Sequence, residues 1–127
     1  MDDKNETTTK EKTLFEILGS DAISAVVEKF YERMLSDDLV SHFFKNTNMQ
    51  FQKKHMKNFI TFATGGPKSY EGRDMRAAHK DMKLTDEHFD RVVFNLATTL
   101  REFSVAEELI KRLADLIEPL RNDVLNR

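Results

Sequence analysis

Apolar residues recur every three or four positions along most of this chain, the spacing that places side chains on one face of an α-helix. No segment alternates apolar and polar residues with the two-residue period of a strand, so the pattern predicts an all-α fold. We expect two longer helices in each half of the chain, joined by loop. The predicted helices cover approximately residues 13–19, 20–35, 47–64, 75–82, 85–103 and 104–120.

Capping signals predict where several of these helices begin. Thr13, Thr47 and Ser104 are each followed three residues later by Glu or Gln, the capping-box combination. Ser20 or Asp21 can cap the second helix, and Thr85 can cap the helix expected over 85–103. The predicted first residue of each helix determines which apolar residues share one face of that helix.

Glycine and proline predict where helices stop. Gly65-Gly66-Pro67 must end the helix that begins near residue 48, and Pro119 is expected to kink or end the last one. The stripes expected to be buried are Val27, Phe30, Tyr31 and Met34; Phe89, Val92, Val93, Leu96, Leu100 and Phe103; and Leu109, Ile110, Leu113, Leu116, Ile117 and Leu120.

Composition narrows the class of protein. The 127 residues suffice for one domain, expected over 13–127 after a flexible polar tail at 1–12. A net charge of −2 gives no reason to expect nucleic-acid binding, and no apolar run approaches the length of a membrane span. Cysteine is absent, which excludes disulfides and thiolate metal sites, and with no signal-like segment we expect a cytoplasmic location.

Four polar side chains fall on faces that are otherwise apolar: Tyr31, Gln52, His55 and His79. Each has an ordinary structural interpretation. Tyr31 can be a core tyrosine bonded to a carbonyl, Gln52 and His55 can be solvated at the edge of their stripe, and His79 can be a core histidine among methionines. The histidines have no HExxH or zinc-finger spacing, and no phosphate-binding loop or GxSxG nucleophile motif occurs.

Several short motifs occur together in one order: Phe30-Tyr31, Phe43-Phe44, Gly65-Gly66-Pro67 and the run from Met75 to His79. In this combination the chain strongly resembles the first group of the truncated haemoglobins, over about residues 13–124. The resemblance implies a two-over-two α-helical sandwich around haem b.

The resemblance also implies roles for individual residues. His79 matches the proximal histidine that ligates haem iron, and Tyr31 matches the distal tyrosine that donates a hydrogen bond to dioxygen. Gln52 matches the glutamine that assists it, and Phe44 the phenylalanine that packs on the haem plane. Further residues implied to line the pocket are Phe59, Met75, Met82, Phe89 and Val93, with Tyr70 and Arg73 as contacts to the propionates.

Two positions on the distal helix bear on ligand binding. Met56 stands where the family often has a second glutamine, and a thioether cannot donate a hydrogen bond. His55 lies one turn after Gln52, where relatives with a histidine use it as a second iron ligand. The alternatives are a bis-histidyl iron, or an aquo or five-coordinate iron with His55 near a propionate.

The implied ligands are dioxygen, nitric oxide and carbon monoxide. One implied function is nitric oxide dioxygenation, or related detoxification of reactive nitrogen and oxygen species, with a separate reductase. The alternatives are reversible oxygen binding for storage, transport or sensing and, if His55 ligates iron, electron transfer. A helical interaction domain without haem is the remaining alternative. We expect a monomer. We also expect noncovalent haem b, because relatives that attach haem covalently do so through a histidine in the last helix, and this chain has no histidine after His88.

Overall fold

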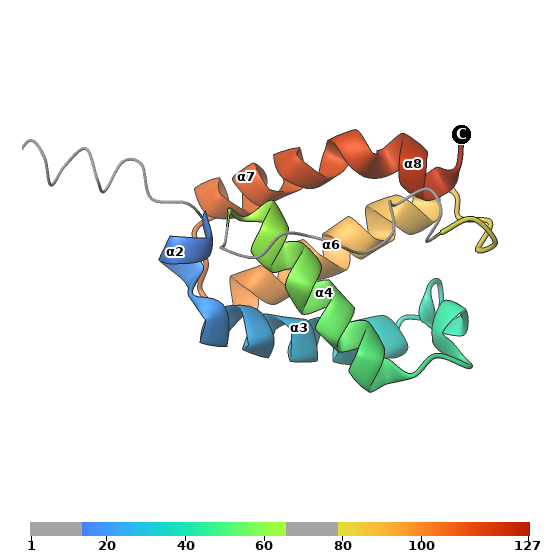
Figure 1. Ribbon diagram of the computed structural model, residues 1–127, viewed down its shortest axis with the longest axis horizontal. Helices are drawn as coiled ribbons and strands as arrows, with labels where there is room; N and C mark the ends of the chain where they lie inside the picture. Colours follow the sequence, from blue (N-terminus) through green and yellow to red (C-terminus); the bar gives the residue numbers. More distant parts are fainter. Residues whose placement is uncertain (1–13, 66–78) are drawn as a thin grey trace, which may run out of the picture.

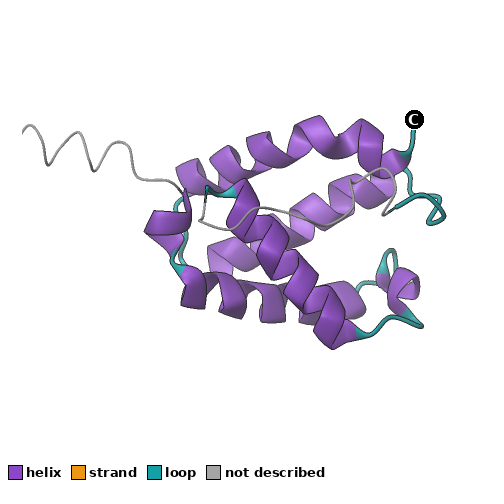
Figure 2. Ribbon diagram, in the orientation of Figure 1, coloured by secondary structure: helices purple, strands orange, loops and turns teal. Residues whose placement is uncertain are grey.

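The computed structural model describes residues 14–65 and 79–127. Within these ranges the chain forms α-helices and two 3-10 helices. Figure 2 shows no strand among the described residues. The predicted all-α class is therefore confirmed. The elements are α2 (Leu14–Leu18), α3 (Ser20–Leu35), η1 (Ser41–Phe44), α4 (Met49–Ala63), α6 (Asp86–Glu102), α7 (Glu107–Ile117), η2 (Glu118–Leu120) and α8 (Arg121–Leu125).

Four longer helices, α3, α4, α6 and α7, make up most of the fold. Helix α3 packs on both α4 and α6, while α6 also packs on α7 and α8. In Figure 1, α4 runs diagonally across the molecule between α3 and α7. The 3-10 helix η1 packs against α3. The two predicted pairs of longer helices are therefore present.

The core lies where α3 meets α4 and α6. On α3 the predicted stripe of Val27, Phe30, Tyr31 and Met34 is buried. Other buried apolar residues are Ile23, Val26, Val40, Ile60, Phe89, Leu96, Leu100, Ile110, Leu113 and Val124.

Two residues predicted to be buried are exposed instead. Phe103 is 40% exposed and Leu116 is 47% exposed. Phe103 is the C-cap of α6, at the turn into α7, where less of the neighbouring helices covers it. Leu116 lies next to Ile117, and one residue turns a helix by about 100°, so Leu116 falls beside the stripe that faces the core.

The structure corrects several predicted caps. Helix α4 is capped by Asn48, whose side chain accepts a hydrogen bond from the backbone N–H of Phe51, and not by Thr47. The N-cap of α3 is Gly19, which has a φ of 84°, a conformation that favours glycine. Neither Ser20 nor Asp21 is therefore the cap. The N-cap of α7 is Ala106 without a side-chain bond, so Ser104 does not form the predicted capping box.

Other predicted boundaries agree with the structure. Thr85 caps α6, and the helix before the glycine pair ends at Ala63, with Gly65 at a φ of 87°. Gly66, Pro67 and most of the predicted helix at 75–82 lie outside the described residues. Its end at 79–82 is a turn, in which the backbone N–H of Met82 donates to the carbonyl of His79 at 3.1 Å.

Pro119 lies in η2, between α7 and α8. Proline lacks an N–H donor and disrupts a continuous helix, so the chain turns there before α8 begins. Within the described ranges, no helix combines the length and the apolar character needed to cross a bilayer.

Candidate functional site

A cavity of about 500 Å³ lies among α3, η1, α4, α6 and the C-terminal segment. This volume falls within the range of about 300–1,000 Å³ that small-molecule and cofactor sites occupy. Most of the wall is aromatic and aliphatic, with a few polar side chains. The lining residues are Phe30, Tyr31, Met34, Val40, Phe43, Phe44, Thr47, Phe51, Gln52, His55, Met56, Phe59, His79, Met82, Leu84, His88, Phe89, Val92, Val93, Leu96, Ile117, Leu120 and Val124.

Tyr31 and Gln52 meet across this cavity wall. The side-chain amide of Gln52 donates a hydrogen bond of 3.0 Å to the hydroxyl of Tyr31. Burial raises the pKa of Tyr31 to about 12, although the bond from Gln52 acts in the opposite direction. The phenol therefore stays protonated near neutral pH. Since its oxygen accepts from Gln52, its proton is left to be donated to a ligand in the cavity.

The surrounding rings hold Tyr31 in place. The Tyr31 ring lies edge-on to Phe30, with centroids 4.9 Å apart, and edge-on to Phe44 at 5.7 Å. Gln52 reaches Tyr31 because the Asn48 cap starts α4 in a frame that places residue 52 toward α3. Helix periodicity places Tyr31 on the inward face of α3 and Gln52 on the inward face of α4. The crossing of the two helices then brings these side chains together.

Two imidazoles line the same cavity, those of His55 and His79. Both are partly buried. The His55 ring lies edge-on to the ring of Phe51, one turn earlier on α4, with centroids 4.6 Å apart. A cavity with imidazoles from two separate segments offers nitrogen ligands for a metal held between them.

Three methionines, Met34, Met56 and Met82, also line the cavity. Their flexible thioethers fill irregular space between rings but donate no hydrogen bond. Met56 lies one turn after Gln52, so the polar side chains that α4 contributes to the cavity lining are Gln52 and His55.

Sequence reasoning missed two polar side chains in the wall, those of Thr47 and His88. The backbone N–H of Thr85 donates to Nδ1 of His88 at 3.1 Å, completing a capping box in which histidine replaces the usual Glu or Gln. The His88 ring also lies edge-on to Phe43, with centroids 4.9 Å apart. The sequence signal that could have identified His88 is its position three residues after the capping Thr85. The capping box also gives His88 a structural role.

The other residues predicted for the site fall into two groups. Phe44, Phe59, Met82, Phe89 and Val93 line the cavity, as do Tyr31, Gln52, His55 and His79. The structure thus brings these nine side chains to one place, and their individual roles remain predictions. Tyr70, Arg73 and Met75 lie outside the described residues.

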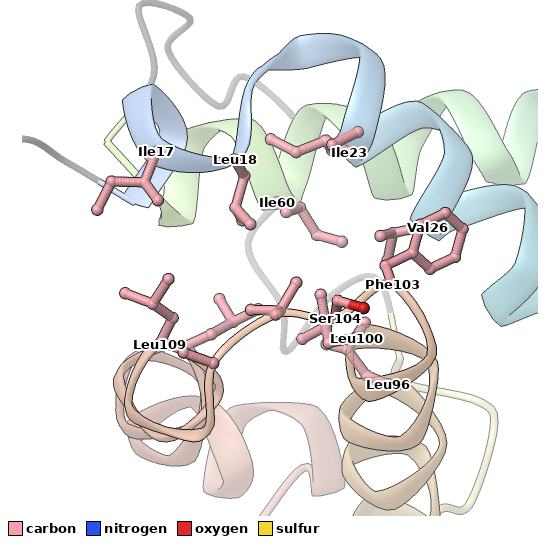
Figure 3. A pocket seen from close by; sticks show the side chains of 14 residues that line it. Ile17, Leu18, Ile23, Val26, Ile60, Leu96, Leu100, Phe103, Ser104 and Leu109 are labelled. Carbon is pink, nitrogen blue, oxygen red and sulfur yellow. The ribbon is translucent and has the colours of Figure 1, made fainter.

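A second, apolar cavity of about 400 Å³ lies near α2 and the turn between α6 and α7. In Figure 3 Leu18, Ile23 and Ile60 face Leu100 and Leu109 across it. Leu96 lines both cavities and therefore lies between them.

The larger cavity fits a haem. A haem needs an apolar enclosure for its macrocycle and an imidazole for its iron, and this wall supplies aromatic and aliphatic side chains together with His79. A protonated phenol beside the cavity suits a small ligand that carries partial negative charge. An all-α domain with such a cavity has the architecture of a globin.

Comparisons with known proteins agree with this architecture. Residues 13–126 match the family model described as bacterial-like globin. The group 1 truncated haemoglobin of Tetrahymena thermophila is 45% identical over 119 residues, covering 93% of this chain and 98% of the relative. The group 1 truncated haemoglobin GlbN of a Synechocystis strain is 44% identical over 122 residues, covering 91% and 98%.

Solved structures give the same result. The Fe(III) form of truncated haemoglobin from Tetrahymena pyriformis superposes with a TM-score of 0.87 at 44% identity, covering 90% of this chain and 98% of that one. The 2/2 haemoglobin of a Synechococcus strain, with covalently attached haem, gives a TM-score of 0.88 at 46% identity, covering 91% and 100%. The chain belongs to the bacterial-like globin family, and within it to the group 1 truncated haemoglobins. The predicted two-over-two sandwich is thereby confirmed, and membership implies a haem iron and diatomic gas ligands.

Proposed function

We propose that this globin binds dioxygen at a noncovalent haem b and supports nitric oxide dioxygenation, or related detoxification of reactive nitrogen and oxygen species, with a separate reductase. His79 would hold the iron, with Phe44, Phe59, Met82, Phe89 and Val93 enclosing the macrocycle. When bound, haem iron supplies the ligation site for a diatomic gas and the electrons for its chemistry. The observation that carries the proposal is the hydrogen bond from Gln52 to the Tyr31 hydroxyl.

Tyr31 and Gln52 act as one donor unit in this proposal. The amide of Gln52 donates a hydrogen bond to the phenol oxygen of Tyr31, which leaves the phenol proton directed toward the cavity. A diatomic ligand with partial negative charge would accept the phenol proton of Tyr31 in a bond that resembles a charge-assisted one of about 1.5–3 kcal/mol. Since each 1.4 kcal/mol is about tenfold in an equilibrium constant, this bond is large enough to decide ligand retention.

The substitution Tyr31→Phe tests the donor role, because it removes the hydroxyl and keeps the ring that packs on Phe30 and Phe44. We expect the dioxygen dissociation rate, measured by stopped flow, to rise by at least about tenfold. Phe30→Tyr is unsuitable as a control because it adds a polar group to the core. Leu35→Ala alters an exposed residue of α3 and should leave the rate unchanged. An unchanged rate in Tyr31→Phe would contradict the role.

Nitrate yield separates turnover from simple binding. Repeated nitric oxide dioxygenation needs an electron for each turnover, which the separate reductase of this proposal would supply. With nitric oxide, dioxygen and an efficient reductase, we expect many equivalents of nitrate per haem. One equivalent only would favour reversible oxygen binding, transport or sensing instead.

One observation favours a second candidate function. His55 and His79 line the same cavity, so both imidazoles could hold one iron in the ligand-free protein. External ligands would then bind only in the fraction of molecules from which His55 has moved away, which lowers their affinity by that fraction. Such a site suits electron transfer or redox detoxification.

Noncovalent attachment also has a direct test. The chain contains four histidines, none after His88, so the last helices offer no imidazole for a covalent bond to the haem. We expect acid-acetone to extract all of the haem. Haem retained by the protein would contradict noncovalent binding without affecting the proposed role of Tyr31.

A further inference from the structure

Arg121 is the first residue of α8 and lies against the start of α6. Its guanidinium carbon is 4.4 Å from the centroid of the Phe89 ring, a cation–π distance. Phe89 itself is buried and lines the larger cavity. One aromatic ring therefore connects Arg121 to the cavity.

Three carboxylates fix the direction of the guanidinium. Nη1 of Arg121 bonds Asp86 at 2.9 Å, Nη2 bonds Asp90 at 2.6 Å, and Nε bonds Glu118 at 2.7 Å. The Arg121 side chain is 20% exposed, so it is less hydrated than an ordinary surface arginine. Asp86 is the first residue of α6, and Asp90 lies one turn later, directly after Phe89.

Arg127 adds to the same cluster from the C-terminal end. Its Nη1 and Nη2 bond the two oxygens of Asp86 at 2.7 and 3.0 Å. The charged groups that face Arg121 are thus Asp86, Asp90 and Glu118, with Arg127 sharing Asp86. Arg121, which begins α8, and Arg127, two residues after α8 ends, both bind the Asp86 carboxylate of α6.

Helix α8 needs such contacts to keep its place. It has five residues, far fewer than an isolated helix needs in water. Val124 of α8 and Leu120 just before it line the cavity, and Pro119 interrupts the helix that precedes them. The position of this wall therefore depends on what attaches α8 to α6.

We infer that Arg121 is a positioning residue for the haem: by stacking on Phe89 and binding the carboxylates at the start of α6, it holds the wall of Phe89, Leu120 and Val124 against the cofactor. The inference rests on the proposed function, because it concerns the haem. Lysine could replace the charge but not the planar fork that binds several carboxylates while lying over a ring.

The test measures haem loss from the full-length holoprotein to an excess of a tighter-binding apoglobin. We expect Arg121→Met to accelerate haem loss by roughly three- to tenfold, with Arg121→Lys in between. The matched control is Arg101→Met, which breaks a bidentate ion pair with Glu107 at the other end of α6. Soret circular dichroism, which reports on aromatic rings around a haem, should change in Arg121→Met and not in the control.

Global stability is measured in parallel by urea unfolding of the same proteins without haem. Equal haem-loss rates for Arg121→Met and Arg101→Met would overturn the inference, as would rates that follow global stability in both variants. If Arg121→Met does not fold, Arg121→Lys and Asp90→Asn replace it, with the same expected direction. Wild-type protein that takes up no haem would refute the proposed function, whereas wild-type haem uptake with unaltered loss in the variants refutes this inference alone.

Discussion

Gln52 of α4 donates a hydrogen bond of 3.0 Å to the hydroxyl of Tyr31 on α3, across 21 positions of sequence. Because the phenol oxygen is the acceptor, the phenol proton is left for a ligand. Tyr31 supplies the donor, and Gln52 determines its direction. Substitutions on either side of this bond should therefore affect ligand retention to different extents.

The substitution Gln52→Leu removes the amide that orients Tyr31. A hydrogen bond between neutral groups contributes about 0.5–1.5 kcal/mol net, so the dioxygen dissociation rate should rise about two- to tenfold. The rise should be smaller than that in Tyr31→Phe, which loses the donor itself. Gln50→Leu, at an exposed position of the same helix, is the control. A Gln52→Leu rate equal to wild type would show that the phenol needs no orienting partner.

The substitution Met56→Gln adds an amide to a wall that has a thioether there. Met56 lines the cavity one turn after Gln52, so an amide at this position can join the donor unit. We expect dioxygen to dissociate up to about tenfold more slowly, by the same hydrogen-bond scale. Met56→Leu keeps the volume and adds no donor, and it should leave the stopped-flow rate near that of wild type. Equal rates in both variants would place residue 56 out of reach of the ligand.

The substitution His55→Ala tests ligation by the second imidazole. His55 and His79 line one cavity, and we expect the dithionite-reduced wild type to show the sharp α and β bands of a bis-histidyl haem. In His55→Ala these bands should collapse to one broad five-coordinate band. A broad ferrous spectrum in both proteins would leave His55 peripheral and would favour the oxygen-binding function. His42→Ala, which removes an exposed imidazole outside the cavity lining, is the control.

Acid stability should depend on Asp37, which joins α3 to α6. A hydrogen bond from Asn95, assisted by the backbone N–H of Leu39 and the charge of Arg91, holds the pKa of Asp37 below its usual value of 3.8. The carboxylate therefore contributes stability above that usual value, and the contribution is lost as pH falls through the lower folded-state pKa.

The substitution Asp37→Asn should lower the free energy of unfolding by about 1 kcal/mol at neutral pH. It should also flatten the loss of stability below about pH 4. Urea unfolding at several pH values measures both effects. Asp38→Asn changes an exposed carboxyl on the next residue and is the matched control. If the two variants show the same pH dependence, the bond to Asn95 does not determine acid stability.

The number of long helices and most of their faces could be predicted from the sequence. Periodicity placed Val27, Phe30, Tyr31 and Met34 on one buried stripe, and the structure buries all four. Thr85 also caps the helix for which it was predicted. Such signals are local, because they depend on residues within one or two turns of the same helix.

Two of the errors occurred where neighbouring residues offer similar local signals. Thr47 and Asn48 can both cap a helix, and only the backbone direction leaving η1 decides for Asn48. Leu116 and Ile117 are both apolar, and the side from which α7 meets the core decides that Leu116 is exposed. A shift of one residue is small in the sequence and changes which side chain faces the core.

By itself, the sequence determined the all-α class, the apolar stripes, and the placing of a phenol, an amide and two imidazoles on otherwise apolar faces. Only the tertiary structure decided that Gln52 reaches Tyr31 and that Arg121 lies over Phe89. Helix periodicity is a property of a few consecutive residues, whereas these contacts depend on how α3 crosses α4 and how α8 returns to α6. Those crossings are set by the packing of all the helices together.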